Sequence, residues 1–204
     1  MSKMDEIIIV APRKEVFENN SLEFQGVETN EDVINTIMSN ISGSFFELRR
    51  GTAEEDPQFK QPIPYAFIIR GDEMFVYERL KGAGETRLHS KLSVGVGGHM
   101  NYIPHQEFKM QALINLTREL NEELNISSSI GNDLKIIGLI NDDSDEVGEV
   151  HIGLLTKIEV PEDTQISVKE TEELKGDFIK IEDLRKPELY GRLENWSKIV
   201  IDSI

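Results

Sequence analysis

The longest helical pattern in the chain, roughly residues 106–124, constrains its fold most. Leu113, Leu116, Leu120 and Leu124 follow one another at spacings of three, four and four residues. At about 100° per residue, these side chains share one narrow stripe that can pack against a sheet. Alternating or apolar segments on both sides of the helix read as strands: 65–70, 73–79, 92–96, 134–140, 147–160 and 176–181. The pattern predicts an α/β fold, with 65–70 and 73–79 joined as a hairpin through Gly71-Asp72.

The same helix carries Glu119, Glu122 and Glu123 on a flank beside the leucine stripe. Like charges at spacings of three and four cost a few tenths of a kcal/mol per pair, so something positive is expected there. A hard divalent cation such as Mg²⁺ or Mn²⁺ suits a site of oxygen ligands. A solvated acidic face has the same spacing, and spacing alone leaves both interpretations open.

Composition narrows the classes of partner. The chain of 204 residues has 38 acidic against 22 basic residues, a formal charge of -16, which disfavours polymeric nucleic acid and anionic membrane surfaces. It has no cysteine, which excludes disulfides, thiolate zinc sites and a cysteine nucleophile. Its longest N-terminal apolar run, residues 7–11, is too short for a signal peptide, and a cytoplasmic location is the default expectation.

The first 60 residues read as a small α/β extension. A strand is expected at 6–10, and Val33, Ile34, Ile37, Met38 and Ile41 recur at helical spacing. Residues 51–64, with three prolines, read as a connection. We therefore predict an extension over 1–60 and a main domain over 61–204. The extension either adds to the sheet or forms a homodimer surface, and the sequence leaves both roles open.

Two stretches resemble the Nudix hydrolase family. They are Gly97-Gly98-His99 and the run Arg118-Glu119-Leu120-Asn121-Glu122-Glu123-Leu124-Asn125-Ile126. The run matches the second half of the family motif, with Asn125 in the place of a glycine; asparagine also tolerates the left-handed conformation that ends many helices. Three further stretches resemble a little-characterised group of Nudix-type phosphoesterases: residues 60–65, 95–99 and 194–198. The resemblance covers roughly residues 62–204 and implies a Nudix-type α/β/α sandwich with a mixed β-sheet.

The first half of the motif departs from the family. From Gly98 to Arg118 the chain advances 118 − 98 = 20 positions, where the family pattern has 14. The slot of the upstream glutamate falls on Pro104 counted forward and on Met110 counted backward, so Glu107 is the nearest substitute. The six extra residues therefore leave open which acid, if any, joins Glu119, Glu122 and Glu123 as a fourth carboxylate.

The resemblance implies a metal-dependent hydrolase. Glu119, Glu122 and Glu123 with the Gly97 carbonyl would bind Mg²⁺ or Mn²⁺, and Arg118 would orient the carboxylates. Metal-activated water would then attack phosphorus in a nucleoside diphosphate linked to another moiety. The substrate implied is a small molecule.

The remaining site residues are less closely specified. For the general base we favour Glu172 or Glu173; other candidates are Asp142, Asp143, Asp145, Glu146 and Glu170. For substrate binding we favour Arg79 and Arg87 over Arg70 and Lys91. His99 either contacts substrate or metal or holds its loop, His151 is expected to be structural, and neither histidine is taken as support for zinc.

Two other functions stay open. A catalytically weak or inactive Nudix-fold nucleotide-binding module would account for the missing upstream glutamate. A Nudix-fold isomerase of isoprenoid diphosphates would keep the metal and the diphosphate, but the members we know use a cysteine, which this chain lacks.

Overall fold

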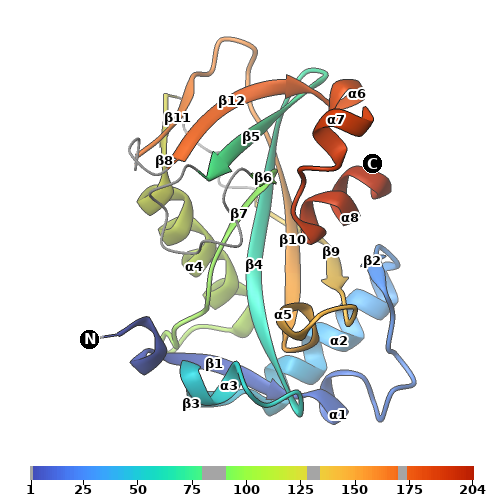
Figure 1. The fold of residues 1–204 in the computed structure, drawn as a ribbon. Helices are drawn as coiled ribbons and strands as arrows, with labels where there is room; N and C mark the ends of the chain where they lie inside the picture. The colour runs from blue at the N-terminus through green and yellow to red at the C-terminus, as the bar shows by residue number, and fades with distance from the viewer. Residues whose placement is uncertain (1, 80–90, 128–133, 170–173) are drawn as a thin grey trace. The chain divides into compact units, whose positions relative to one another are not determined.

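A computed structural model of the chain describes residues 2–79, 91–127, 134–169 and 174–204 (Figure 1). The chain divides into two compact units. The first unit comprises Met1–Tyr65, Gly97–Leu116 and Ile136–Leu155, and the second comprises Ala66–Val96, Thr117–Lys135 and Thr156–Ile204. The division falls inside strands β4 and β10 and helix α4. The domain boundary at residue 60 stays a prediction.

The elements follow one another in mixed order. Before residue 66 they are η1 (Lys3–Asp5), β1 (Ile7–Pro12), α1 (Arg13–Val16), β2 (Gly26–Glu28), α2 (Glu31–Ser44), β3 (Phe46–Arg49), α3 (Arg50–Ala53) and the start of β4 (Phe59–Arg70). Next come β5 (Glu73–Arg79), β6 (Leu92–Ser93), β7 (Gly95–Gly97), α4 (Phe108–Glu123), β8 (Leu124–Ile126), β9 (Ile136–Asn141), α5 (Glu146–Glu149) and β10 (His151–Glu159). The last are β11 (Ile166–Val168), β12 (Leu174–Lys180), α6 (Ile181–Leu184), α7 (Pro187–Tyr190) and α8 (Asn195–Ser203). The predicted α/β class with a mixed sheet is confirmed.

The first unit has its own apolar core. Helix α2 begins after Asn30, whose side chain accepts hydrogen bonds from the backbone N–H groups of Asp32 and Val33. Its buried face is formed by the predicted residues Ile34, Ile37 and Ile41, which pack with residues of β1, α1, β9 and β10. Strand β1 pairs antiparallel with β3 and with the start of β4. The strand order continues β4-β10-β9-β2.

The second unit contains the predicted hairpin. Ile69 pairs with Met74 and Arg70 with Glu73 across the turn, which confirms the hairpin of β4 and β5. Strand β12 pairs antiparallel with β5 along its full length, and β6 lies beside β5 as well. Near the C-terminus, the Ser197 hydroxyl of α8 accepts a hydrogen bond from the backbone N–H of Val94 at 3.0 Å.

Helix α3 ends at Ala53 and strand β4 begins at Phe59, so the prediction that residues 51–64 form a connection is wrong for its first three and last six residues. The backbone N–H of Gln61 donates to the Val150 carbonyl beside it. Because successive N–H groups of a strand point to opposite sides, Pro62 and Pro64 face the other edge and remove no donor from this side of the ladder. Strands tolerate proline at such positions.

Two local expectations also differ from the structure. The strand predicted over 147–160 starts at His151, because Asp145 caps the short helix α5 by accepting from the Gly148 N–H at 2.7 Å. Asn125 does not end helix α4 in a left-handed conformation; it lies in β8 and pairs with Ser167 of β11. In the part of the chain that the structure describes, none of the helices combines the length and the apolar character needed to cross a membrane.

Candidate functional site

The predicted leucine stripe is confirmed for three of its four residues. Leu116 and Leu120 of α4 and Leu124 at the start of β8 are each at most 3% exposed, whereas Leu113 is half-buried. Burying that stripe leaves the flank with Glu119, Glu122 and Glu123 at the helix surface, near its C-terminal end. The three carboxylate-bearing residues therefore share one side of the last two turns, as their spacing requires.

Arg118 joins two of these carboxylates. Its Nη2 atom lies 2.8 Å from Oε1 of Glu119, and its Nη1 atom lies 3.2 Å from Oε2 of Glu122. The side chain of Glu119 is 13% exposed and that of Glu122 is 58% exposed. Charge-assisted hydrogen bonds from one planar guanidinium restrict both carboxylates and reduce the repulsion between them. One carboxylate is sheltered and the other faces solvent.

The C-terminal end of α4 is fixed by main-chain pairing. Strand β8 follows the helix directly and pairs antiparallel with β11. The backbone N–H of Lys169 donates to the Glu123 carbonyl at 2.8 Å, and the Lys169 ammonium donates to the Asn121 carbonyl. Carbonyls that a helix end leaves without partners are thereby satisfied. The turn that carries Glu122 and Glu123 is thus anchored to a second segment of the same unit.

Gly97 ends β7 and belongs to the first unit. A Cβ atom at this position would lie 2.4 Å from the Pro64 carbonyl oxygen and 3.1 Å from Cα of Tyr65. Close approach of the neighbouring backbone explains a glycine here whether or not its carbonyl binds metal. Ahead of α4, Pro104 and Glu107 are exposed, and Met110 is exposed in its first turn.

The other predicted site residues are placed as follows. Arg79 ends β5, where its backbone pairs with Leu174. Arg70 forms an ion pair with Glu73 at 2.6 Å, and its guanidinium lies 3.8 Å from the centre of the Phe178 ring. Three residues that we favoured, Arg87, Glu172 and Glu173, lie outside the described residues, as does Glu170. Their assignments stay predictions.

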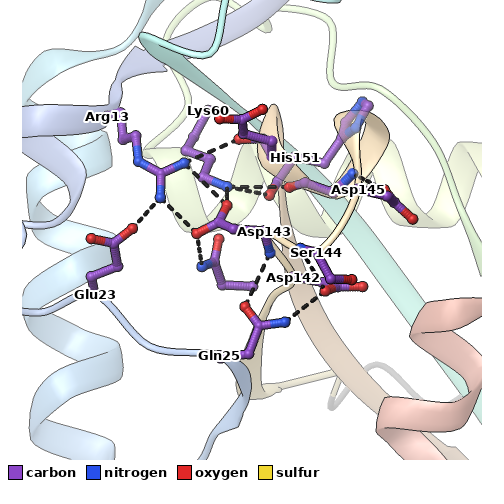
Figure 2. Close-up of polar contacts among 12 residues, drawn as sticks. Arg13, Glu23, Gln25, Lys60, Asp142, Asp143, Ser144, Asp145 and His151 are labelled. Atoms are coloured by element: carbon purple, nitrogen blue, oxygen red, sulfur yellow. Dashed lines mark hydrogen bonds and ion pairs between the residues drawn. The ribbon is translucent and has the colours of Figure 1, made fainter.

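The acids of the loop after β9 hold the first unit together (Figure 2). Asp143 accepts from Arg13 at 2.6 Å and from the buried Lys60 ammonium at 2.9 Å. Gln25 donates to Asp142 at 2.6 Å. Asp145 caps α5, while Glu146 in the first turn of that helix is exposed. Three of the four loop acids considered as general bases are therefore engaged in internal contacts.

Burial and pairing act on the ionisation of this network. Burial lowers the pKa of the Lys60 ammonium to about 8, although Asp143 opposes the shift. Burial raises the pKa of Asp143, but hydrogen bonds from Arg13 and Lys60 outweigh burial and hold its pKa well below the ordinary value. Lys60 also donates to the carbonyls of Gly148 and His151, each at 3.2 Å.

A second group of potential metal ligands lies within the first unit. Glu54, His99 and His151 each offer one ligand atom, and these atoms all lie within 4.8 Å of one another. Nε2 of His99 lies 3.2 Å from Nε2 of His151 and 3.6 Å from Oε1 of Glu54. Burial lowers the pKa of His99 to about 2 and also lowers the pKa of His151, so both imidazoles are neutral near pH 7.

The sequence did not point to this group. Glu54 lies in the segment interpreted as a connection, and His151 was expected to be structural. The three residues are separated by 99 − 54 = 45 and 151 − 99 = 52 positions, so no short spacing links them. Only the packing of the end of α3, the segment after β7 and the start of β10 brings them together.

Comparisons with known proteins agree with the fold. No family model matches the chain. The protein YmaB of Bacillus subtilis (strain 168) is 49% identical over 203 residues, which cover 99% of this chain and 98% of that protein. The crystal structure of Tm1382, provisionally described as a Nudix hydrolase, superposes with a TM-score of 0.76 at 29% identity and covers 97% of both chains.

A more distant structure shows the fold alone. The MutT Nudix hydrolase of Burkholderia pseudomallei superposes with a TM-score of 0.52 at 15% identity. The match covers 71% of this chain and 98% of that one. A nearly complete Nudix hydrolase chain is therefore matched by about seven-tenths of this sequence.

Proposed function

Because this chain belongs to the Nudix superfamily, we propose that it is a divalent-metal-dependent hydrolase of a diphosphate bond in a nucleoside diphosphate linked to another moiety. The observation that carries this proposal is the pair of ion contacts from Arg118 to Glu119 and Glu122. They place oriented carboxylates at the anchored end of α4, within the motif that resembles the family.

The donor set fits a hard divalent ion. Glu119, Glu122 and Glu123 supply only carboxylate oxygens, the ligands that Mg²⁺ and Mn²⁺ prefer. Sheltered Glu119 would have its position fixed by Arg118, and exposed Glu122 leaves the site accessible from solvent. A bound divalent ion would screen diphosphate charge and lower the pKa of a bound water.

The proposed reaction adds one water across the diphosphate. A bond forms between the water oxygen and one phosphorus, the bond from that phosphorus to the bridging oxygen breaks, and a general base takes the water proton. In this scheme Arg118 is a positioning residue, since its hydrogen bonds hold Glu119 and Glu122. Glu172 or Glu173 is proposed as the base, and Arg79, Arg87 and His99 as contacts to the substrate.

A nucleotide-binding module without turnover is the second candidate. It is favoured by one observation: neither Pro104 nor Met110 supplies an acid in the slot of the upstream glutamate. Glu107 is exposed just before α4 and is the residue available to substitute. The module would bind a nucleotide diphosphate at the same affinity before and after Glu122→Gln, with no hydrolysis by either protein.

A substrate screen tests the hydrolase proposal. Dinucleotides, nucleotide sugars, ADP-ribose, coenzyme A and nucleoside triphosphates would be incubated with Mg²⁺ or Mn²⁺, and products separated by chromatography. We expect turnover of at least one substrate class and its loss in Glu122→Gln. Glu162→Gln, a change at an exposed turn residue, is the matched control and should keep the wild-type rate. Turnover of no substrate above the level of Glu122→Gln would overturn the proposal.

A further inference from the structure

We propose that Glu54, His99 and His151 bind a divalent transition-metal ion, with Zn²⁺ as the best match. The site would use residues of the first unit only and none of the α4 carboxylates. It would share His99 with the proposed substrate contacts but none of the proposed Mg²⁺ or Mn²⁺ ligands on α4, so changes at those carboxylates would leave it intact.

The spacing of the ligand atoms fits a shared ion. Two ligands bound to Zn²⁺ at about 2.0–2.1 Å in tetrahedral geometry lie about 3.3 Å apart. The two Nε2 atoms are 3.2 Å apart, His99 Nε2 is 3.6 Å from Glu54 Oε1, and His151 Nε2 is 3.9 Å from Glu54 Oε2. The first two separations lie within about 0.3 Å of the value for one ion, and the third, which runs to the other carboxylate oxygen, is about 0.6 Å longer.

The hydrogen bond on the far side of His151 fixes which nitrogen faces the cluster. Its Nδ1 atom lies 2.6 Å from the Val147 carbonyl oxygen, which can only accept. Nδ1 therefore carries the proton of the neutral ring, and Nε2 presents a lone pair to His99 and Glu54. Metal-binding histidines usually donate their other ring N–H to such a carbonyl.

Acceptors outnumber protons inside the cluster. Nε2 of His99 can carry at most one proton, yet it faces the lone pair of His151, the Glu54 carboxylate and Oε1 of Gln61, the last at 2.8 Å. In the described structure, the buried Nε2 of Gln61 has no hydrogen-bond partner. A cation bound between His99, His151 and Glu54 would interact with the lone pairs of these residues that a single proton cannot satisfy.

The ligand types select the ion. Two imidazoles and one carboxylate suit Zn²⁺ and neighbouring first-row ions better than Mg²⁺, which prefers oxygen ligands and retains its waters. Arg50 donates from Nε to Oε1 of Glu54 at 3.1 Å and would orient the carboxylate, as groups behind a ligand commonly do. Its positive charge also faces the cluster and opposes binding of a cation, as does Lys60 near His151.

An ion held here would join three segments that are remote in sequence: the end of α3, the residues after β7 and the start of β10. Because the unfolded chain does not hold these ligands together, binding would stabilise the folded state, and the stabilisation would grow with the logarithm of the ion concentration. The ion is thus expected to raise the unfolding temperature of the whole chain.

The test uses the full chain without a histidine tag, stripped with a chelator and titrated with Zn²⁺. We expect one tightly bound Zn²⁺ per chain by elemental analysis, a rise in Tm, and visible bands typical of a four-coordinate ion with mixed nitrogen and oxygen ligands when Co²⁺ replaces Zn²⁺. His99→Gln, His151→Gln and Glu54→Gln should each weaken binding at least tenfold. His105→Asn, at an exposed histidine with a left-handed backbone, should leave binding unchanged.

Two further measurements make each outcome decisive. Glu122→Gln should keep the Co²⁺ bands while losing Mg²⁺-dependent hydrolysis, so failure of this inference is distinguishable from failure of the proposed function. If a histidine variant does not fold, the Co²⁺ spectrum of the wild-type chain and the response of Glu54→Gln decide. Absence of four-coordinate Co²⁺ bands in the wild-type chain, or Zn²⁺ binding by Glu54→Gln equal to wild type, would overturn the inference.

Discussion

Lys60 is completely buried, and its ammonium nitrogen lies 2.9 Å from a carboxylate oxygen of Asp143 (Figure 2). The two residues are 143 − 60 = 83 positions apart, so the contact fastens β4 to the loop after β9. Arg13 binds the other oxygen of the same carboxylate at 2.6 Å. A fully buried cation is retained because a carboxylate and two carbonyls satisfy it.

Replacing this lysine should destabilise the first unit strongly. In Lys60→Met, Asp143 loses one of its two cations, and the carbonyls of Gly148 and His151 lose a donor. Removing one partner of a buried pair costs about 3–5 kcal/mol, so we expect a loss of that order in the free energy of unfolding by urea. Lys157→Met, at a surface pair with Glu159, is the control and should change it by less than about 1 kcal/mol. Equal losses of stability in Lys60→Met and Lys157→Met would contradict a stabilising role for the buried pair of Lys60 and Asp143.

The Asp143 carboxylate should make the stability of the folded protein sensitive to acid. The folded-state pKa of Asp143 is depressed below the ordinary value of about 3.9, because hydrogen bonds from Arg13 and Lys60 outweigh burial. Its stabilising contribution is therefore fully present above about pH 4 and is lost as the pH falls further. Asp143→Asn should lower stability at pH 7 and flatten the decline of the unfolding free energy below pH 4. Parallel pH profiles for variant and wild type would count against this carboxylate as the cause.

Two glycines should respond with opposite sign. Gly97→Ala places a Cβ atom 2.4 Å from the Pro64 carbonyl oxygen, so backbone must shift, and we expect a loss of about 1–3 kcal/mol. Gly43→Ala, in helix α2, adds a Cβ that meets no side chain or backbone from elsewhere in the described structure within 4 Å, and it should gain about 0.5–1 kcal/mol from helix propensity. Thermal unfolding, monitored by circular dichroism, measures the change in stability of both variants. A neutral Gly97→Ala would remove the packing explanation for that glycine.

Arg118→Lys tests the ion contacts that join Arg118 to Glu119 and Glu122 on α4. Lysine keeps the charge but lacks the planar fork that contacts Glu119 and Glu122 together. We expect kcat for metal-dependent hydrolysis to fall by about 10–100-fold, with a smaller change in KM for the substrate. Arg192→Lys, at a surface pair with Glu78, is the matched control and should keep the wild-type rate. An unchanged kcat in Arg118→Lys would mean that these ion contacts stabilise the helix and do not position the carboxylates for hydrolysis.

Local patterns in the sequence predicted the elements that depend on neighbouring residues. The helix at 106–124 was correct to within two residues at its start and one at its end, because its leucine stripe repeats at helical spacing. The hairpin was correct because its turn residues and alternation lie within one short segment. The carboxylates of α4 were placed on one flank by the same periodicity.

Tertiary packing decided the features that the sequence did not indicate. Strand β4 includes Pro62 and Pro64 because these prolines alternate with Gln61, whose N–H donates to the Val150 carbonyl, so the missing N–H groups lie on the opposite edge. Asn125 joined a strand because β11 offered it a partner, a pairing 167 − 125 = 42 positions away. The grouping of Glu54, His99 and His151 likewise depends on three remote segments, and a glutamate in a predicted connection carries no local sign of it.

The central claim is tested most directly by hydrolysis in ¹⁸O-labelled water with Mg²⁺, followed by phosphorus NMR and mass spectrometry on the best substrate of the screen. We predict that one product phosphate gains a single ¹⁸O atom, and that kcat/KM falls at least about 100-fold in Glu122→Gln, as expected when a group acting on the transition state is lost. Equal rates for the wild-type chain and Glu122→Gln, or products free of ¹⁸O, would contradict the account.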